Sequence, residues 1–478
     1  MHLVVDRASP ITLTDQLFAG LKRLMLDGGL AEGERLPPSR TLAMELGVSR
    51  TVTVEVFERL AAEGFVVATQ GSGTFVASGA RLAPAPRTGR EQSPALSPVG
   101  FEPLRSDIID FRTGVPELRL FPIRLWQRLA REVWERLTPR DLAYSAPEGR
   151  PELRAAIAAY LRVHRGVVCD PDQIVVTSGT TQAVAVLGSA LASGGRTVVV
   201  EDPVTNDIPR ILKRSGAAPT PVPLDGEGIQ VERLPVRPIP AFVYITPSHH
   251  YPLGIAMPIG RRTALIGYAR RTGAYLVEDD YDSEFRYGLP PVSTLFELDP
   301  ERVIYIGTFS KTLAPALRTA FIVAPWPVVR CVREAKWHAD LHNASPEQLV
   351  LARFIREGHY ARHLARMQKI YQRKWRVLRE ALVRELGDSV TILGSPAGMH
   401  VAARFRGVRF TPKLLAAFER QGVKVYPVAL HAAQPKRWAG CLAIGFGHLS
   451  EEQIDRGVAI LARTLHSTAG LTLTKSTP

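Results

Sequence analysis

The 478-residue sequence has few cysteines and no long apolar run, and each shortage excludes a class of protein. Cys169, Cys331 and Cys441 are odd in number, widely separated and without metal-ligand spacing. Neither a disulfide framework nor a cysteine metal site is therefore expected. No apolar stretch approaches the roughly 18 to 20 residues needed to cross a bilayer, and the first residues lack the pattern of a signal peptide. We expect a cytoplasmic protein that does not engage a membrane.

The composition, 45% hydrophobic and 22% charged, suits a chain of this length that folds into two or three domains. The net charge is +14, yet residues 1–78 hold seven Lys/Arg and nine Asp/Glu. The densest basic stretch is Arg353–Arg379, where nine Lys/Arg face the single Glu357. Its basic positions are 353, 356, 362, 366, 369, 373, 374, 376 and 379. Two interpretations stay open, a solvated helix face or a groove that faces phosphates.

The first 78 residues show the signals of three helices followed by a hairpin. Leucines recur every three or four residues from Ile11 to about Asp27, the spacing of one buried helix face. Ser39 is expected to cap a second helix and Ser49 a third, with Gly47 in the tight turn between them. Two short β runs then surround Gly71 and Gly73, which predicts a hairpin. This order is that of an α+β winged helix-turn-helix over residues 1–78.

Such a fold binds duplex DNA with the first residues of its third helix in the major groove. These residues are Ser49, Arg50, Thr51 and Thr53. Arg50 is the expected base reader because its planar fork can donate two hydrogen bonds to guanine. Arg35 and Arg40 are expected to bind phosphates, and the glycines Gly71 and Gly73 to let the wing approach the DNA closely. An ordinary three-helix bundle with surface arginines is the bland alternative.

Residues 36–43, 47–50 and 70–76 match the pattern of the GntR-type winged-helix domain, which this stretch resembles. Residues 79–105 change character, because five prolines alternate with Ala, Gly, Ser and Arg. We predict a semi-rigid linker there.

Residues 106–478 alternate helix and strand patterns. Helices are expected at 124–137, 151–164 and 179–192, and strands at 174–177, 197–200, 242–246, 275–277, 303–306 and 320–323. Short apolar strands bounded by helices predict a mostly parallel sheet covered on both faces. A smaller α/β subdomain is expected from about residue 346.

Lys311 follows an apolar strand and has hydroxyls near it at Thr308 and Ser310. A lysine placed this way suits imine formation with pyridoxal phosphate once its surroundings favour the neutral amine. That cofactor also needs a phosphate cradle, an anion beside its pyridine nitrogen and groups that hold its phenolic oxygen. Candidates for all of these follow other strands of the same sheet.

The cradle is expected at Ser178, Gly179 and Thr180, where a strand ends and a helix begins. Arg318, seven residues beyond Lys311, is the candidate second phosphate ligand. The run Glu278-Asp279-Asp280-Tyr281 lies at the carboxyl end of a strand, where open α/β sheets bind ligands. We favour Asp279 over Asp280 as the partner of the pyridine nitrogen. Tyr281 is expected near the phenolic oxygen and Tyr251 near the ring edge.

From Phe111 onward the chain resembles aminotransferases of fold type I, and its fusion to a winged helix resembles the MocR regulators of the GntR superfamily. The resemblance implies a large sheet domain with a smaller α/β domain, transcription control, and a head-to-tail homodimer in which Tyr144 reaches the phosphate site of the other subunit. Two departures stand out. Thr205 occupies the position of the stacking aromatic, and Ala443 that of the arginine which clamps an amino acid's carboxylate. Efficient transamination of α-amino acids is therefore not expected, unless other arginines take over the clamp.

Three functions compete at this point. The leading hypothesis is a regulator whose effector is pyridoxal phosphate itself, which would place the protein in the control of vitamin B6 metabolism. An amino acid or amine that acts on the bound cofactor is the alternative effector. A working aminotransferase with an added DNA-binding module is the third hypothesis, and the missing arginine argues against it.

Overall fold

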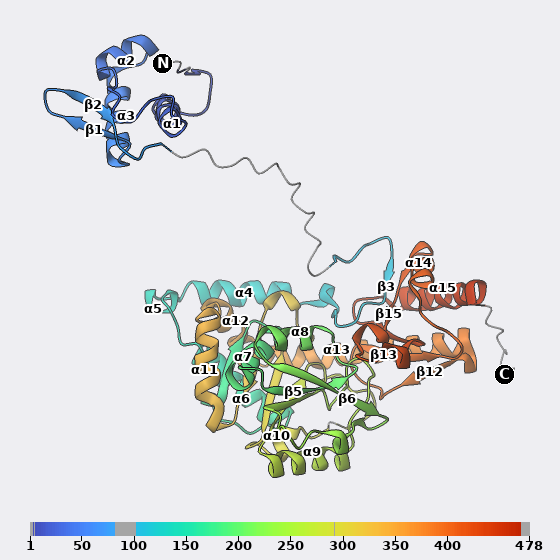
Figure 1. The fold of residues 1–478 in the computed structure, drawn as a ribbon. Helices are drawn as coiled ribbons and strands as arrows, with labels where there is room; N and C mark the ends of the chain where they lie inside the picture. The colour runs from blue at the N-terminus through green and yellow to red at the C-terminus, as the bar shows by residue number, and fades with distance from the viewer. Residues whose placement is uncertain (1–2, 4, 82–101, 291, 470–478) are drawn as a thin grey trace. The chain divides into compact units, whose positions relative to one another are not determined.

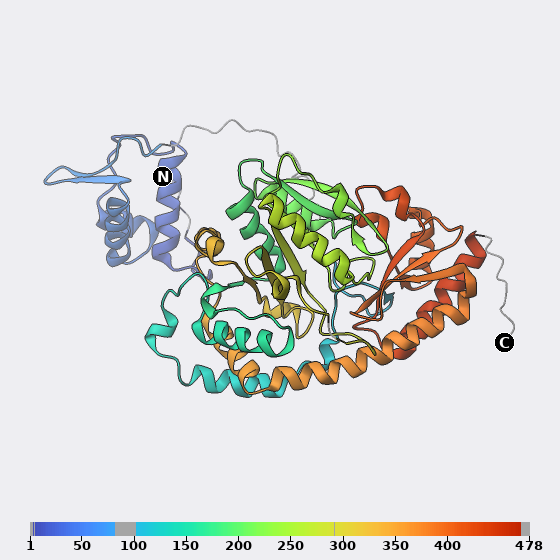
Figure 2. The ribbon, with the colours of Figure 1, turned by 90° about the horizontal axis from the view of Figure 1, so that it is seen from below.

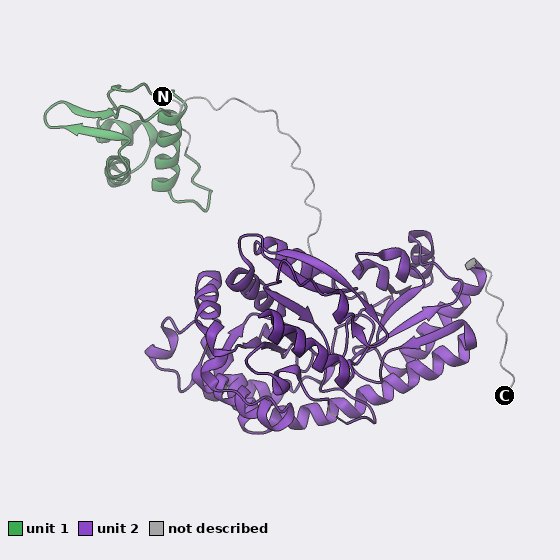
Figure 3. Ribbon diagram, turned by 60° about the horizontal axis from the view of Figure 1, so that its bottom comes forward, with its two compact units in different colours: residues 1–102 green, residues 103–478 purple. Residues whose placement is uncertain are grey.

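The computed structural model describes residues 3, 5–81, 102–290 and 292–469. The chain divides into two compact units, Met1–Glu102 and Pro103–Pro478 (Figure 3). Most of the predicted linker, residues 82–101, lies outside the described residues, whereas Ala80 is buried in the core of the first unit. Among the described residues, no helix combines the length and the apolar character that a membrane span requires.

The first unit is a three-helix bundle with a β-hairpin, as the sequence predicts. Its elements are α1 (Leu13–Leu26), α2 (Ser39–Leu46), α3 (Arg50–Ala62), β1 (Val66–Thr69) and β2 (Gly73–Val76). The Ser49 hydroxyl accepts a hydrogen bond from the backbone N–H of Val52 and so caps α3. The prediction that Ser39 caps α2 is wrong, because Pro38 is the N-cap residue and Ser39 lies in the first turn. Leu17, Leu21, Leu42, Val56 and Leu60 fill the core.

An eight-stranded sheet forms the centre of the second unit (Figure 1). In spatial order it contains β4 (Ile174–Thr177), β11 (Ala320–Val323), β10 (Val303–Thr308), β9 (Tyr275–Asp280), β8 (Phe242–Ile245), β5 (Thr197–Asp202), β6 (Ala218–Asp225) and β7 (Gly228–Ile229). Strands β10, β9, β8, β5 and β6 pair in parallel, whereas β11 pairs antiparallel with both of its neighbours. The mostly parallel sheet that the sequence predicts is therefore present.

Alternate residues of these strands face two separate apolar cores, which explains why the strands read as continuous apolar runs. Val199 and Val243 face one core, which the following helices cover: α4 (Ile123–Trp134), α6 (Pro151–His164), α9 (Ile259–Thr272), α10 (Leu295–Leu298) and α12 (Ser345–Arg356). Val198 and Tyr244 face the other, covered by α7 (Thr180–Ala192), α8 (Asp207–Arg214) and α11 (Trp326–Asp340). The short α5 (Pro139–Leu142) lies between α4 and α6 in the chain.

The smaller part has its own sheet and core. Its elements are β3 (Ile109–Asp110), α13 (His359–Leu386), β12 (Val390–Leu393), β13 (His400–Phe405), α14 (Pro412–Arg420), β14 (Val423–Lys424), β15 (Tyr426–Pro427), β16 (Cys441–Gly445) and α15 (Glu451–Ala469). Figure 2 shows α13, in orange, passing from the large part to the small one. The predicted start near residue 346 is too early, because α12 packs into the large core, and β3 joins the small part by pairing with β14.

Candidate cofactor site and DNA-binding face

The loop between β4 and α7 is the candidate anion cradle. Gly179 has a φ of 90°, and a Cβ there would lie 2.7 Å from the Arg318 guanidinium. That guanidinium donates a hydrogen bond of 2.5 Å to the Ser178 carbonyl oxygen. Thr180 is the first residue of α7, so its backbone N–H is at the positive end of the helix dipole. The predicted residues Ser178, Gly179, Thr180 and Arg318 thus lie together.

Two further residues hold this loop: Gln182, the last residue of the predicted cradle run Ser178–Gln182, and Asn343, which sequence reasoning missed. The Asn343 side-chain amide donates a hydrogen bond of 2.8 Å to the Ser178 hydroxyl, and Gln182 accepts one of 2.6 Å from the Ser178 backbone N–H. Gln182 lies in the same motif, one helical turn on. Asn343 comes from the connection between α11 and α12, so only the fold reveals its role.

The adjacent carboxylates Asp279 and Asp280 have different surroundings. The Arg165 guanidinium donates two hydrogen bonds, of 3.0 and 2.7 Å, to Asp280 Oδ2, and Tyr305 donates a third of 2.7 Å. Burial opposes ionisation of Asp280, but Arg165 holds its pKa below the ordinary value. Asp280 is therefore a structural anion that is already paired.

Asp279, in contrast, has no arginine partner among the described residues. Its Oδ2 accepts a hydrogen bond from the Tyr244 hydroxyl, whereas its Oδ1, like that of Asp280, is buried without a hydrogen-bond partner. Burial raises the pKa of Asp279 to about 7. A cationic ring N–H of a bound cofactor would satisfy Oδ1 and favour the ionised carboxylate. Of the two candidates, Asp279 is the one that fits a pyridinium partner.

Lys311 follows β10, and its ammonium nitrogen donates a hydrogen bond of 2.8 Å to the Gly114 carbonyl oxygen. Burial lowers the pKa of Lys311, although Asp282 and Asp279 oppose that shift. The Thr308 hydroxyl accepts a hydrogen bond of 3.2 Å from the Ser310 backbone N–H, which fixes the turn before the lysine. A buried lysine with a lowered pKa is the type of amine that reacts with an aldehyde.

A cluster of tyrosines and histidines lies next to Thr113, the residue before the Gly114 that accepts a hydrogen bond from Lys311. Tyr251 lies 2.9 Å from the Thr113 hydroxyl and 3.2 Å from His431 Nε2. The Tyr281 hydroxyl lies 3.3 Å from Nδ1 of His249. Burial lowers the pKa of His431 to about 4, so its imidazole is neutral at pH 7.

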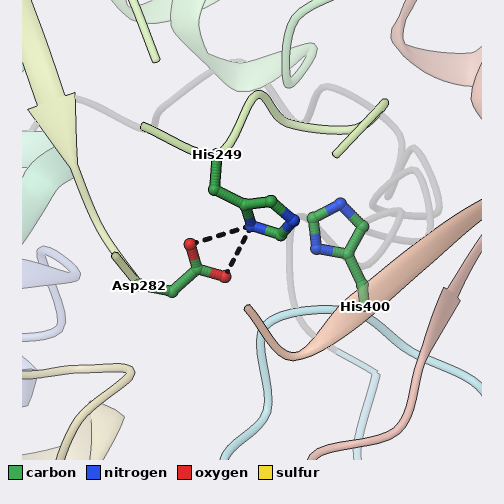
Figure 4. A group of neighbouring side chains, drawn as sticks. All are labelled: His249, Asp282 and His400. Atoms are coloured by element: carbon green, nitrogen blue, oxygen red, sulfur yellow. Dashed lines mark hydrogen bonds and ion pairs between the residues drawn. The ribbon is translucent and has the colours of Figure 1, made fainter. Parts of the chain in front are cut away.

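The carboxylate of Asp282 orients His249, the histidine whose Nδ1 lies near the Tyr281 hydroxyl. His249 Nδ1 lies 3.0 and 3.1 Å from the two oxygens of Asp282, and the His400 ring packs beside it (Figure 4). His400 Nε2 lies 3.2 Å from the Pro252 carbonyl oxygen, which orients that ring. Reasoning from sequence missed all three residues, although His249 and Asp282 are next to predicted site segments. These contacts fix the His249 ring, and its Nδ1, when it donates to Asp282, cannot also accept a hydrogen bond from the Tyr281 hydroxyl.

The two departures from the aminotransferase pattern also have a place in the structure. Ala443 is fully buried in β16, opposite Ala402 and Tyr426 on the neighbouring strands. Thr205 is half-buried in the connection between β5 and α8. A threonine cannot stack on an aromatic ring, and an alanine cannot form a bidentate pair with a carboxylate.

Most of the residues predicted to contact DNA are exposed in the first unit, at the start of α3, on α2 and at the wing. Arg50 and Thr51 are exposed at the first turn of α3, and Arg40 is exposed on α2. Arg35 lies against the wing, because a Cβ at Gly73 would be 2.7 Å from its Nε. Gly71 has a φ of 79° at the hairpin tip. Its backbone can therefore come close to a duplex.

Thr53 does not belong to this face, and its prediction as a base contact is wrong. Its side chain is fully buried, and its hydroxyl donates to the carbonyl oxygens of Ser39 and Arg50, both at 2.9 Å. Thr53 follows Ser49 by about one helical turn, and this places its side chain on the side of α3 that packs against α2. Thr53 therefore connects α2 to α3.

Comparisons with known proteins agree with this division. The gntR family of bacterial regulatory proteins matches residues 13–76, and the aminotransferase class I and II family matches residues 106–461. The chain is 35% identical to the probable rhizopine catabolism regulatory protein MocR of Rhizobium meliloti, over 99% of both proteins. It is 31% identical to the pyridoxine biosynthesis transcriptional regulator PdxR of Corynebacterium glutamicum, over 80% of this chain and 81% of that one.

Among solved structures, LysN from Thermus thermophilus is similar to the second unit. LysN is an α-aminoadipate aminotransferase, complexed there with N-(5'-phosphopyridoxyl)-L-leucine. The TM-score is 0.70 at 29% identity, and the match covers 77% of this chain and 94% of LysN.

Fold and site together define a DNA-binding regulator that joins a winged helix to a pyridoxal phosphate domain of fold type I. The chain belongs to the MocR-type transcription regulators. The free Asp279 oxygen, the cradle around Gly179 and the buried Lys311 fit the cofactor. When bound, pyridoxal phosphate supplies an aldehyde that bonds to amines and a ring that withdraws electrons.

Proposed function

We propose that the effector of this regulator is pyridoxal phosphate itself, and that the protein controls vitamin B6 metabolism. The observation that carries the proposal is Ala443, buried where an aminotransferase needs an arginine, in a site that keeps the groups expected to hold the cofactor. Such a site is suited to binding pyridoxal phosphate and lacks the usual clamp for an amino-acid carboxylate. The PdxR relative, named for pyridoxine biosynthesis, supports this proposal.

Thr205 supports the same conclusion, because it should lower the fraction of protein molecules that hold the cofactor. Without an aromatic ring stacked on the cofactor, the site loses a contact that would otherwise slow cofactor release. A sensor has to be partly empty at working concentrations, because a saturated site cannot report supply. Binding then shifts a balance between two arrangements of the protein by the difference in affinity for them.

The runner-up is a regulator that senses an amine or amino acid through bound cofactor. The MocR relative, named for rhizopine catabolism, favours an effector other than the cofactor. An active aminotransferase with an added DNA-binding module is the third candidate, and Ala443 counts against it. The proposed site of action is the cytoplasm, where duplex DNA is available to the winged helix.

The assembly belongs to the same proposal, as a head-to-tail homodimer. Tyr144 is 83% exposed, and its only described ring contact is the edge of His342, at 6.1 Å between ring centroids. A large aromatic side chain so exposed near the phosphate loop suits a partner subunit. Tyr144 would then complete the phosphate site of the other copy.

The test is DNA binding by cofactor-free protein, titrated first with pyridoxal phosphate and then with amino acids and amines. A change in DNA affinity on adding the cofactor alone is expected. No change with the cofactor, followed by a clear change with one amino acid or amine, would reject the proposal and support the runner-up. Ala443→Arg is an informative variant, because it should add a response to amino acids if the missing clamp excludes them.

A further inference from the structure

The positive charge of this regulator is concentrated outside its winged helix. Residues 1–78 carry a net charge of −2, although the whole chain carries +14. Duplex DNA is dense in negative charge, and each phosphate contact made by Lys or Arg strengthens binding. The second unit therefore holds the charge that could bind phosphates, and α13 holds its densest run.

The basic residues of the stretch Arg353–Arg379 differ in their surroundings. Lys374 is buried and donates a hydrogen bond of 2.9 Å to Glu117, so its charge is neutralised inside the protein. Arg353, on the preceding helix α12, bonds to Glu132 and Glu357. For these two, the basic stretch is explained by ion pairs within the unit.

Five other basic residues form a stripe on one face of α13, which we call the α13 stripe. It consists of Arg362, Arg366, Lys369, Arg373 and Arg376, all exposed. Their spacing of four, three, four and three residues keeps them on one side of the helix over about 21 Å. Five like charges side by side repel one another, which is a cost unless an anion neutralises them.

Most of the α13 stripe has no acidic partner to neutralise it. Arg373 lies 3.3 Å from Glu451, and Arg362 contacts the Glu357 carbonyl oxygen and His359. In the part of the chain that the structure describes, Arg366, Lys369 and Arg376 have no carboxylate within ion-pair distance. The side chains at 362–373, with Ala365 and Ile370 between them, line an open hollow of about 570 Å³.

We propose that the α13 stripe is a second phosphate-binding surface, which contacts duplex DNA flanking the sequence read by α3. The proposal rests on the DNA-binding function of the winged helix, because that unit brings the duplex to the protein and raises its local concentration. Five exposed cationic side chains in a row, three of them without a carboxylate partner, are suited to a linear polyanion. The stripe would add affinity without adding sequence preference.

The test uses the full-length protein and a duplex that it selects from a random library, embedded in either a short or a long flanking sequence. The variant is Arg366→Gln with Lys369→Gln and Arg376→Gln. A matched control, Arg409→Gln with Lys413→Gln and Arg420→Gln, removes the same charge from exposed positions around α14. Affinity is measured as a function of salt concentration for each protein and each duplex.

The wild-type protein should bind the long duplex more tightly than the short one. The stripe variant should lose that gain, about tenfold or more at low salt, and its salt slope on the long duplex should fall by about 2 to 3. The α14 control should behave as wild type. Arg50→Ala should lose preference for the selected sequence but keep the gain from flanking DNA.

Equal salt slopes for wild type and the stripe variant on the long duplex would overturn the stripe proposal and leave the DNA-binding function intact. The same loss in both triple variants would show a general charge effect and would overturn it as well. A wild-type protein that selects no duplex would contradict DNA binding itself, and the stripe would fall with it.

Discussion

Arg50 and Lys311 carry the proposed chemistry of the two units, and they lie in opposite surroundings. Arg50 is exposed at the first turn of α3, with water on most sides. Lys311 is buried beside Asp279 and Asp282, and burial lowers its pKa. A surface charge can meet a large, mobile partner and can be replaced without rebuilding a core. A buried amine gains reactivity from its surroundings, but only within a network that the whole fold has to supply.

The same contrast holds for the acidic groups. In the first unit, Asp15 is half-buried, with 49% of its side chain exposed, and pairs with Arg59. In the second, burial raises the pKa of Glu201 to about 8 and that of Glu278 to about 7. Glu201 lies 3.5 Å from His250, whose own pKa burial lowers to about 3, so the two form a neutral contact at pH 7 rather than an ion pair. Burial therefore shifts the pKa values of acidic groups in the second unit, whereas the Asp15–Arg59 pair of the first unit lies at the surface.

The largest expected effect is at Lys311. Lys311→Ala should abolish the covalent cofactor adduct that borohydride traps in the wild-type protein, because no other amine is expected in the same position. Mass spectrometry of the reduced, digested protein is the measurement. Lys374→Ala is the matched control, because it also removes a buried lysine and should keep the adduct, since Lys374 pairs with Glu117. An adduct on another lysine would show that the site assignment is wrong.

Arg50 should give the next largest effect. Arg50→Ala is expected to cost about 1 to 3 kcal/mol on the preferred sequence and to relax preference at one base pair. Arg40→Ala, on the neighbouring helix, should weaken binding to all sequences and lower the salt slope by about one. Titration of specific and random duplexes measures both. Equal losses on both duplexes for both variants would remove the distinction between a base reader and a phosphate contact.

Local features of the fold could be predicted from the sequence because they depend on neighbouring residues. The cap at Ser49 and the bounds of α6, β4 and β11 follow from such local patterns. The site could be outlined by motif, but the sequence held no physical reason for preferring Asp279 to Asp280. That reason depends on Arg165, which is 115 residues away from Asp280 in the chain.

Long-range packing also explains what sequence reasoning missed. His431 reaches Tyr251 across 180 residues, and Asn343 reaches the phosphate loop across 165. The boundary of the small part was misplaced because α12 looks like any amphipathic helix until its contacts with α4 and α6 are known. Residues joined by tertiary contact leave no local signal.

The stability of the second unit should depend on protonation of the buried Glu201. Glu201 has a pKa of about 8 when folded and an ordinary one near 4.5 when unfolded, so the folded state binds the extra proton between these values. Its contribution to the free energy of unfolding should therefore fall as pH rises from about 5 to 8. Glu201→Gln should reduce this loss by about 1 to 2 kcal/mol between pH 6 and pH 8.

Urea unfolding of the second unit at the two pH values measures this difference. The control is Glu334→Gln on the surface of α11, which should leave the pH dependence as in wild type. If Glu201→Gln and wild type lose the same free energy between pH 6 and pH 8, the buried carboxyl is ionised throughout. Burial in the second unit would then shift the pKa of acidic groups less than the structure indicates, and the two units would differ less in this respect.

The smallest expected effect separates two threonines of the same helix. Thr53→Val keeps the shape of the side chain but removes the hydroxyl that donates to the Ser39 and Arg50 carbonyl oxygens. It should lower the free energy of unfolding of the winged helix by about 1 kcal/mol. Thr51→Val, two residues earlier and exposed, should change stability by less than about 0.5 kcal/mol but weaken DNA binding. Thermal unfolding and DNA titration, made on both variants, should give opposite results for the two positions. A loss of DNA affinity in Thr53→Val with unchanged stability would return Thr53 to the DNA-binding face, because a hydroxyl that only joins α2 to α3 acts on DNA solely through the fold.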